Sequence, residues 1–233
     1  MTDSSRHTAQ PGRATADLAF FGKVTASVTH ELNNVISIID QTAGLLGDLI
    51  AGEERGIPIS TERLAGAAAT IQRQTQRGLG IIARLNRFAH TADAVRAVFD
   101  LNDVVGNIVT LSERLAGLKR IRLEFRPSEF ATPVSGSPFA FQHLVFTALQ
   151  AVVAAAKPDT TILVKTEAQQ NGLAVGIFSV GQLTLDRDSL AGLSALSEPF
   201  SGTVAVQPEG QQTALWLNVR VSSPEGTATP GPG

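Results

Sequence analysis

Hydrophobic residues recur with a helical period over the first part of the chain. From about Asp17 to Ala51, spacing the residues at about 100° each gathers the apolar side chains on one side of a helix. These are Val24, Val28, Leu32, Val35, Ile39 and Leu46, and the opposite side carries Lys23, His30, Asn33, Asn34, Ser37, Gln41 and Asp48. The pattern predicts a long amphipathic helix with a polar stripe.

A second helix is predicted after an interruption at Gly52 to Pro58, capped by Ser60 or Thr61 and running to about Ala89. Two helices of about 30 residues form a hairpin that cannot hide its apolar seam alone, so we expect a second copy to complete a four-helix bundle. In a monomer, the rest of the chain would have to cover the seam. The seam residues of this helix are Leu64, Ala68, Ile71, Thr75, Ile82, Leu85 and Ala89, and its other side carries Arg73, Arg77, Arg84 and Arg87.

After residue 99 the pattern changes, and short strand-like stretches alternate with helical ones. The helical stretches are 101–118 and 137–156, and the strand-like ones are 121–125, 161–167, 173–179, 203–207 and 214–221. We therefore expect an α+β protein, in which the hairpin is followed by an α/β sandwich with two or three helices on a mostly antiparallel sheet.

Composition narrows the classes of function. The 233 residues carry a net charge of −2, which gives no general attraction to nucleic acid or to an anionic membrane. The absence of cysteine excludes disulfides and thiolate metal sites. The longest apolar run, 144–156, is too short for a bilayer, and residues 1–17 contain no signal-peptide core. We predict a cytoplasmic protein with no membrane or nucleic-acid partner, and disordered tails at 1–16 and 223–233.

The sharpest signal for chemistry is the run His30-Glu31-Leu32-Asn33-Asn34. A neutral imidazole is a nucleophile near pH 7, and a neighbouring carboxylate can fix its tautomer or accept its proton. Asn34 follows His30 by four positions, so both side chains reach the same space above a helix. Taken alone, a His-Glu pair is more often a surface histidine among polar neighbours. We find no grouping of His, Asp and Glu with the spacing of a metal site.

This run resembles the H-box of sensor histidine kinases, the helix that carries the phosphorylated histidine in their dimerisation domain. Three more segments resemble these kinases in the right order: IARLNRFA (82–89), FDLNDVV (99–105) and GSPFAFQ (136–142). They are similar to the end of the second dimerisation helix, to the opening of the ATP-binding domain and to the lead-in to its N-box. The resemblance covers about residues 18–221 and implies a sandwich of the ATP-binding (Bergerat) type.

The same resemblance assigns roles to three residues. It implies that His30 is the phosphoacceptor and that Glu31 is its acid/base neighbour. Glu31 with Asn34 also matches the E-x-x-N pattern that these kinases use to dephosphorylate a response regulator.

The chain departs from the kinases where they bind nucleotide. Thr147 or Ala151 stands where an N-box asparagine should ligate Mg²⁺. The adenine-reading Asp-x-Gly-x-Gly is replaced by SVGQL at 179–183. After EPF (198–200), which resembles the start of the lid, the chain passes through Ser201-Gly202 directly into its last hairpin. We therefore expect no ATP-dependent autophosphorylation, no cofactor and no resident metal.

An intact H-box without a nucleotide site resembles the dimeric histidine phosphotransferases that derive from kinases. The predicted function is phosphoryl transfer between receiver-domain aspartates through His30, with Mg²⁺ supplied only by the receiver. The predicted domains are a phosphoacceptor hairpin at 17–92 and a degenerate ATP-binding-like sandwich at 99–222. The expected partners are response-regulator receiver domains, a hybrid sensor kinase and a second copy. Two alternatives remain open: a response-regulator phosphatase that uses Glu31 and Asn34, and a non-catalytic adaptor that binds a kinase or regulator.

Overall fold

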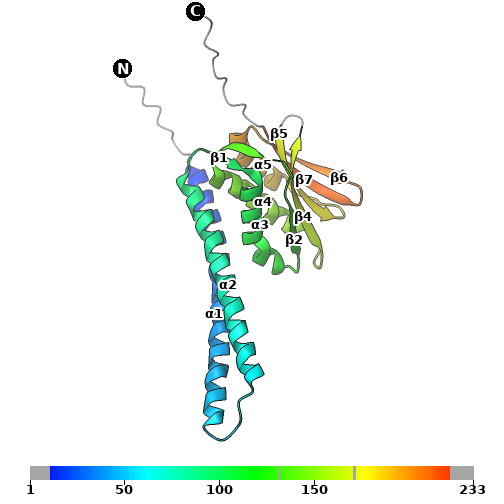
Figure 1. Ribbon diagram of the computed structural model, residues 1–233. Helices are drawn as coiled ribbons and strands as arrows, with labels where there is room; N and C mark the ends of the chain where they lie inside the picture. The colour runs from blue at the N-terminus through cyan, green and yellow to red at the C-terminus, as the bar shows by residue number, and fades with distance from the viewer. Residues whose placement is uncertain (1–10, 131, 170–171, 221–233) are drawn as a thin grey trace, which may run out of the picture. The chain divides into compact units, whose positions relative to one another are not determined.

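The computed structural model describes residues 11–130, 132–169 and 172–220 (Figure 1). The chain divides into two compact units, Met1–Arg87 and Phe88–Gly233. A helical part followed by a mixed sheet with its own helices confirms the expected α+β class. The division falls before residue 92, because the ring of Phe88 packs against that of Phe139, with centroids 6.0 Å apart.

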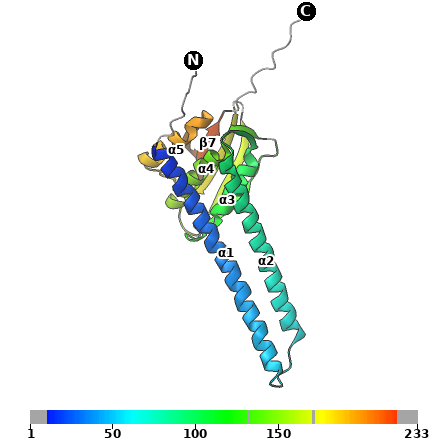
Figure 2. The same cartoon turned by 90° about the vertical axis from the view of Figure 1, so that its left-hand side faces the viewer.

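The first unit is a hairpin of α1 (Pro11–Glu53) and α2 (Thr61–His90), whose last turn belongs to the second unit. The two helices run antiparallel along their length (Figures 1 and 2). The expectation that residues 11–16 belong to a disordered tail is wrong, since they form the first turns of α1. Proline suits a first helical position, where its φ is already helical and no N–H is wasted. Residues 1–10 and 223–233, the rest of the expected tails, lie outside the described residues.

The buried side of α1 agrees with the predicted seam, but that of α2 is rotated. Val24, Val28 and Val35 are buried on α1. On α2 the buried residues include Ala67, Gly78 and Ile81, whereas Ala68, Thr75 and Ile82 are exposed. A Cβ placed on Gly78 would lie 3.4 Å from Cγ1 of Val35, so a glycine of α2 packs against a buried valine of α1. Hydrophobic periodicity gives weight to large apolar side chains and therefore misses such a contact.

The second unit is built on one mixed sheet. Its five strands lie in the order β2-β4-β5-β7-β6, with β2 parallel to β4 and the other neighbours antiparallel. Three helices cover one face of this sheet (Figures 1 and 2), and β1 and β3 form a separate antiparallel ribbon that the sequence pattern did not predict. The elements are β1 (Ala97–Asp100), α3 (Leu101–Gly117), β2 (Arg122–Arg126), β3 (Pro133–Gly136), α4 (Pro138–Ala155), β4 (Thr161–Gln169), β5 (Gly172–Val180), α5 (Arg187–Ser197), β6 (Thr203–Glu209) and β7 (Gln212–Val219), with 3₁₀ turns η1 (Thr91–Asp93) and η2 (Glu198–Phe200).

The central strand β5 is buried from Leu173 to Ser179, which explains its continuous apolar sequence. On the face opposite the helices, the rings of Phe178 and Trp216 pack edge to face with centroids 5.3 Å apart. They close over Gly176, where an added Cβ would lie 2.7 Å from an atom of each ring. The glycine therefore makes room for the aromatic pair.

A polar network holds the start of α3. Asp100 caps the helix, since its Oδ1 accepts a hydrogen bond from the backbone N–H of Asn102 at 2.7 Å and from Oγ1 of Thr132 at 3.0 Å. The side-chain oxygen of Asn102 accepts from the backbone N–H of Ser128 at 3.0 Å and from the hydroxyl of Thr166. These bonds connect β1, α3, β4 and the loop after β2.

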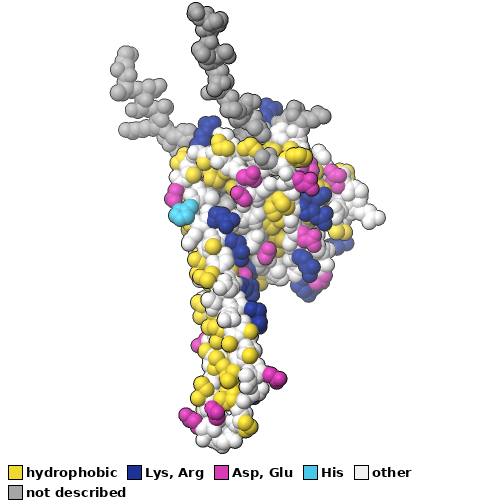
Figure 3. Space-filling view, viewed as in Figure 1, with side chains coloured by type: hydrophobic (Ala, Val, Ile, Leu, Met, Phe, Trp, Pro, Cys, Tyr) yellow, Lys and Arg dark blue, Asp and Glu magenta, His cyan; other side chains and the backbone are white. Residues whose placement is uncertain are grey.

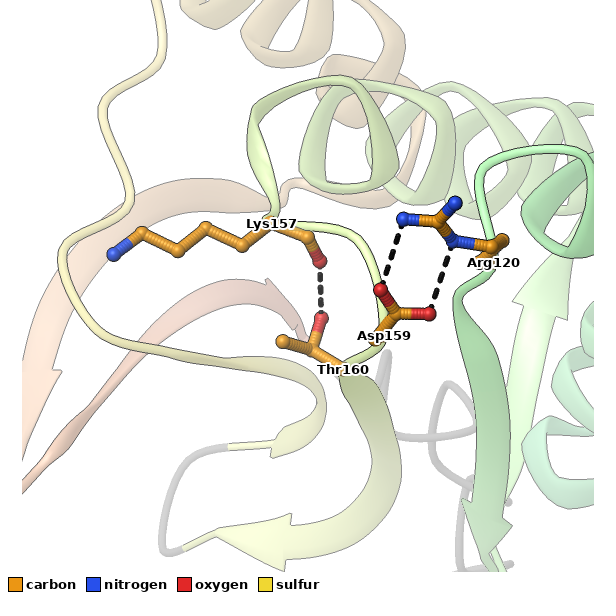
Figure 4. A network of polar contacts seen from close by, with 4 residues as sticks. All are labelled: Arg120, Lys157, Asp159 and Thr160. Atoms are coloured by element: carbon orange, nitrogen blue, oxygen red, sulfur yellow. Dashed lines mark hydrogen bonds and ion pairs between the residues drawn. The ribbon is translucent and has the colours of Figure 1, made fainter.

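Two loops of this unit are joined by a charged pair (Figure 4). Nε and Nη2 of Arg120 donate to the two carboxylate oxygens of Asp159 at 3.0 and 2.9 Å, and the backbone N–H of Asp159 donates to the carbonyl of Arg120 at 2.9 Å. Both residues have a positive φ, 57° and 62°. Beside them, the hydroxyl of Thr160 donates to the carbonyl of Lys157 at 2.6 Å. The pair fastens the loop before β2 to the loop before β4.

Candidate functional site

His30 and Asn34 lie in the interior of α1 with both side chains exposed. Their spacing of four residues puts them on one side of the helix, one turn apart. Within the described part of the chain, neither side chain makes a hydrogen bond or an ion pair. The imidazole and the amide are therefore open to a molecule that approaches from solvent.

Glu31 does not contact His30 in this structure. Its Oε1 accepts a hydrogen bond from Nη2 of Arg77 on α2 at 2.9 Å, and the carboxylate is the more buried of the two partners (28% exposed, against 52% for the guanidinium). The hydrophobic pattern placed Arg77 on the side of its helix opposite the apolar seam and did not predict this contact. Periodicity identifies the faces of one helix, but it does not give the register between two.

Basic side chains follow one flank of the hairpin, while hydrophobic side chains gather along the other flank (Figure 3). The only acidic residue of α2 is Glu62 in its first turn, and its arginines are Arg63, Arg73, Arg77, Arg84 and Arg87. Nη2 of Arg73 donates to the hydroxyl of Thr70 on its own helix at 2.9 Å, so this guanidinium does not bridge the two helices.

A partly exposed apolar repeat runs along α1, beside the buried side of the helix. Its residues, separated alternately by four and three positions, are Leu32, Ile36, Ile39, Ala43, Leu46 and Ile50. Ile36 is 60% exposed and Ile50 is 54% exposed. On α2, Leu79 and Ile82 are likewise exposed. A heptad repeat of this kind is typical of a helix that packs against another helix.

Two helices of the described chain, Gly12–Glu53 and Pro138–Ala155, have the length and mean hydropathy of a membrane span. The most apolar window of α4 is 61% buried, as in the core helix of a globular domain. The corresponding window of α1 is only 11% buried, so this helix exposes much of its apolar surface.

In the second unit, the positions that resemble a nucleotide site hold groups that are neutral or already engaged. Thr147 and Ala151 lie half-buried on α4. Gly181 follows β5 with φ of 81°, its N–H donates to the carbonyl of Gln211 at 3.1 Å, and its carbonyl accepts from the hydroxyl of Thr213 at 2.8 Å. The backbone of Gly181 is thus occupied by the β6–β7 hairpin.

The segment that resembles the start of a lid is a tight turn. Phe200 is buried, and its ring meets that of Phe141 edge to face with centroids 5.0 Å apart. Only Ser201 and Gly202 separate η2 from β6, and the N–H of Gly202 donates to the carbonyl of Ser197 at 3.1 Å. A Cβ on Gly202 would lie 2.8 Å from the carbonyl oxygen of Asn218. This connection packs directly on the sheet.

The other candidate sites carry no recognisable chemistry. A cavity of about 170 Å³ is lined by Gln169, Gly172, Leu173, Ser201, Thr203, Asn218, Val219 and Arg220, none of which belongs to the predicted site. Among the described residues, no group of three or more His, Asp or Glu side chains could hold a metal ion.

The sequence matches no protein-family model and no curated protein. Solved structures that it resembles include the Acinetobacter baumannii histidine kinase AdeS (14% identity, TM-score 0.47, 83% of this chain and 98% of that one). Another is the ATP-binding domain of PrrB from Mycobacterium tuberculosis (14%, 0.47, 55% and 99%). A third is the histidine kinase ThkA in complex with the response regulator TrrA (16%, 0.46, 88% and 63%). At such identities and TM-scores, these similarities carry no weight for the function.

Proposed function

We propose that this chain is a histidine phosphotransfer protein, in which His30 accepts a phosphoryl group from the aspartyl phosphate of one receiver domain and passes it to another. The observation that carries the proposal is the exposed imidazole of His30, unengaged within the described chain and held in the interior of a long helix. A rigid helix presents a nucleophile in a fixed direction, which favours in-line attack.

The transfer balances without a further reactant. The unprotonated ring nitrogen of His30 attacks phosphorus, an N–P bond forms, and the P–O bond to the receiver's aspartate breaks with release of the carboxylate. The second ring nitrogen can give its proton to solvent. The reverse sequence at the next receiver regenerates the free imidazole. The receiver supplies Mg²⁺ and the acidic pocket, so this chain contributes the nucleophile and a docking surface.

In this proposal the chain does not phosphorylate itself from ATP. Neither Thr147 nor Ala151 offers the amide oxygen that would ligate Mg²⁺. The N–H of Gly181, which would have to approach phosphate, is bound to Gln211. The two-residue connection between η2 and β6 leaves no room for a glycine-rich phosphate loop.

We further propose that the chain works as a cytoplasmic homodimer. The partly exposed repeat from Leu32 to Ile50 is the kind of surface that a second copy would cover in a four-helix bundle. A membrane fits α1 less well, because its polar stripe, which includes Asn34, Ser37 and Gln41, would then face lipid.

The direct test is incubation of the protein with a panel of receiver domains that carry [³²P]aspartyl phosphate. We expect acid-labile, alkali-stable label on the wild type and none on His30→Ala. Addition of a second, unphosphorylated receiver should remove the label. Labelling by Mg-[γ-³²P]ATP alone, or label that persists in His30→Ala, would refute the proposal.

A second candidate function, dephosphorylation of a response regulator, is favoured by the exposed and unengaged amide of Asn34 one turn from His30. An amide in this place could orient water toward the aspartyl phosphate. The two functions separate by substitution: Asn34→Ala should abolish phosphatase activity and spare labelling of the protein, whereas His30→Ala should do the reverse. If neither substitution affects a receiver that binds, the chain acts as a non-catalytic adaptor.

A further inference from the structure

We propose that Arg77 is a positioning residue for the chemistry of His30: it holds the Glu31 carboxylate against α2 and so leaves the neighbouring imidazole free to react. The inference rests on the proposed function for its biological meaning, but its central claim concerns only the reactivity of one side chain.

The faces of the two helices place Arg77 on the flank of the hairpin that carries Asn34. Around α1, the buried Val28 and Val35 mark the side that faces α2. At about 100° per residue, Asn34 falls on one flank of that side and Ile36 on the other, while His30 lies beyond Asn34, about 140–160° from the two valines and close to the outward side of the helix.

Around α2, Gly78 and Ile81 are buried, with Arg77 on one flank and Ile82 on the other. In an antiparallel pair, these assignments bring the arginine flank beside the Asn34 flank and the two apolar flanks together. The ion pair between Glu31 and Arg77 crosses the hairpin on this same side.

The contact between Arg77 and Glu31 is end-on rather than bidentate. It joins one nitrogen, Nη2, to one oxygen, Oε1, at 2.9 Å. Within the described chain, Glu31 has no other hydrogen bond or ion pair. Arg77 is therefore the restraint that decides where this carboxylate points.

Loss of the restraint should change the surroundings of His30. Glu31 is its immediate neighbour in sequence, and the two Cβ atoms lie about 100° apart around the helix axis. Once freed, the flexible carboxylate can turn out of the hairpin and accept a hydrogen bond from the imidazole, which stabilises the protonated, non-nucleophilic form of the ring. Because exposed ion pairs are weak, we expect a moderate effect on reactivity, about twofold to fivefold.

The test measures the rate at which diethyl pyrocarbonate acylates His30 at pH 7, followed by mass spectrometry of peptides from the whole protein. In this reaction the ring nitrogen attacks a carbonyl carbon, an N–C bond forms, and ethyl carbonate leaves. His90, which belongs to the other unit and lies 13 positions after Arg77 at the end of α2, serves as the internal standard. The assay needs no receiver, so it remains informative even if phosphotransfer fails.

Five variants separate the mechanism from its alternatives. Arg77→Met removes the donors and keeps the apolar stem, and we expect His30 to react about twofold to fivefold more slowly. Arg77→Lys should restore the wild-type rate, because an end-on contact with one oxygen needs only a point charge. Arg73→Met is the matched control, since it removes an equal charge from the same helix without touching Glu31. In Glu31→Gln, adding Arg77→Met should have no further effect.

Three outcomes would overturn the inference: no slowing in Arg77→Met, equal slowing in Arg73→Met, or slowing by Arg77→Met that persists in the Glu31→Gln background. The rate of phosphotransfer from a labelled receiver should rank the variants in the same order as the rate of acylation of His30. A wild type that is never labelled, but whose acylation rates follow that order, would refute the proposed function and leave the role of Arg77 standing.

Discussion

Polar side chains at the start of α3 in the sandwich form one connected network, whereas two exposed polar side chains of the hairpin, those of His30 and Asn34, bond to nothing in the described chain. Asp100, Asn102, Thr132 and Thr166 are joined in one hydrogen-bonded network. His30 and Asn34, by contrast, have no hydrogen bond or ion pair and are open to solvent.

The difference reflects two physical constraints. A buried or half-buried polar group usually bonds to a partner inside the protein, because an unmade hydrogen bond costs about 1–3 kcal/mol there. An exposed group on a helix is satisfied by water and can exchange that water for a ligand. An exposed polar group with no partner in the protein is therefore available to a ligand, and His30 and Asn34 are such groups on the hairpin.

The largest effect that we expect comes from His30→Gln. It should reduce phosphoryl labelling by about a thousandfold or more, because the nucleophile is lost. It should change the free energy of unfolding by no more than about 0.5 kcal/mol, because the imidazole makes no internal bond. Urea titration followed by circular dichroism measures the second quantity. A destabilisation well above that value would show that the imidazole of His30 makes a bond inside the protein. The contrast between His30 and the bonded polar groups of the sandwich would then be wrong.

The next effect tests the tightness of the sandwich. Gly176→Ala places a Cβ 2.7 Å from Phe178 and from Trp216, and we expect a loss of about 1–3 kcal/mol of stability from overpacking. Trp216 is the only tryptophan, and the chain has no tyrosine, so its fluorescence reports unfolding of this unit alone.

Gly192→Ala in α5 is the matched control for that substitution. A Cβ there would meet nothing within 4 Å, and replacing a helical glycine by alanine should stabilise the protein by about 0.5–1 kcal/mol. If both variants shift the urea midpoint in the same direction, the close contact of Gly176 with the aromatic pair does not explain the effect of Gly176→Ala.

Much of the fold could be predicted from the sequence, because periodicity reports burial directly. The hairpin, the two helices at 101–118 and 137–156 and the strands of the main sheet all follow from it. The β1–β3 ribbon could not be predicted, since each strand has only four residues and its pairing, such as Phe99 with Val134, spans more than thirty positions. The rotated seam of α2 was missed because its buried residues include Ala67 and Gly78, which a search for large apolar side chains passes over.

The candidate site was predicted only in part. His30 and Asn34 are exposed on one side of the helix, as their spacing predicts. The partner of Glu31 was not foreseen, because Arg77 lies 46 positions away, and which arginine it meets depends on the length of the connection between the helices. A charge of opposite sign on the facing helix was the available signal, but it pointed equally to several arginines.

A smaller effect tests the polar network of the sandwich through pH. Burial alone would raise the pKa of Asp100, but hydrogen bonds from Asn102 and Thr132 outweigh it and hold the pKa below its usual 3.8. A lowered pKa means that the folded state favours the carboxylate, so this stabilisation is present above pH 3.8 and is lost as the pH falls through the folded value.

Asp100→Ala should therefore cost about 0.5–2 kcal/mol at pH 7, the usual value of a helix cap. The gap between variant and wild type should narrow below pH 3.8, as measured by urea titrations from pH 7 to pH 2.5. Other carboxylates titrate in both proteins and cancel in the difference. A gap that stays constant over this range would mean that the charge of Asp100 contributes nothing to the cap.

The smallest effect concerns two side chains of the sandwich that are exposed to solvent and also bonded to each other. They combine the exposure of His30 with the internal bonds of the Asp100 network. Arg120 and Asp159 make two hydrogen bonds, but their side chains are 70% and 68% exposed, so a double-mutant cycle with alanine should give a coupling of only about 0.2–1 kcal/mol. Raising the salt concentration to 1 M should reduce the coupling further. A second substitution at position 120 distinguishes the backbone contribution from that of the ion pair. Because φ is 57° there, Arg120→Gly should be more stable than Arg120→Ala by about 0.5–1 kcal/mol. A coupling well above 1 kcal/mol would mean that exposed groups of this chain can carry stability. Exposure alone would then no longer distinguish the free groups of the hairpin from the structural groups of the sandwich.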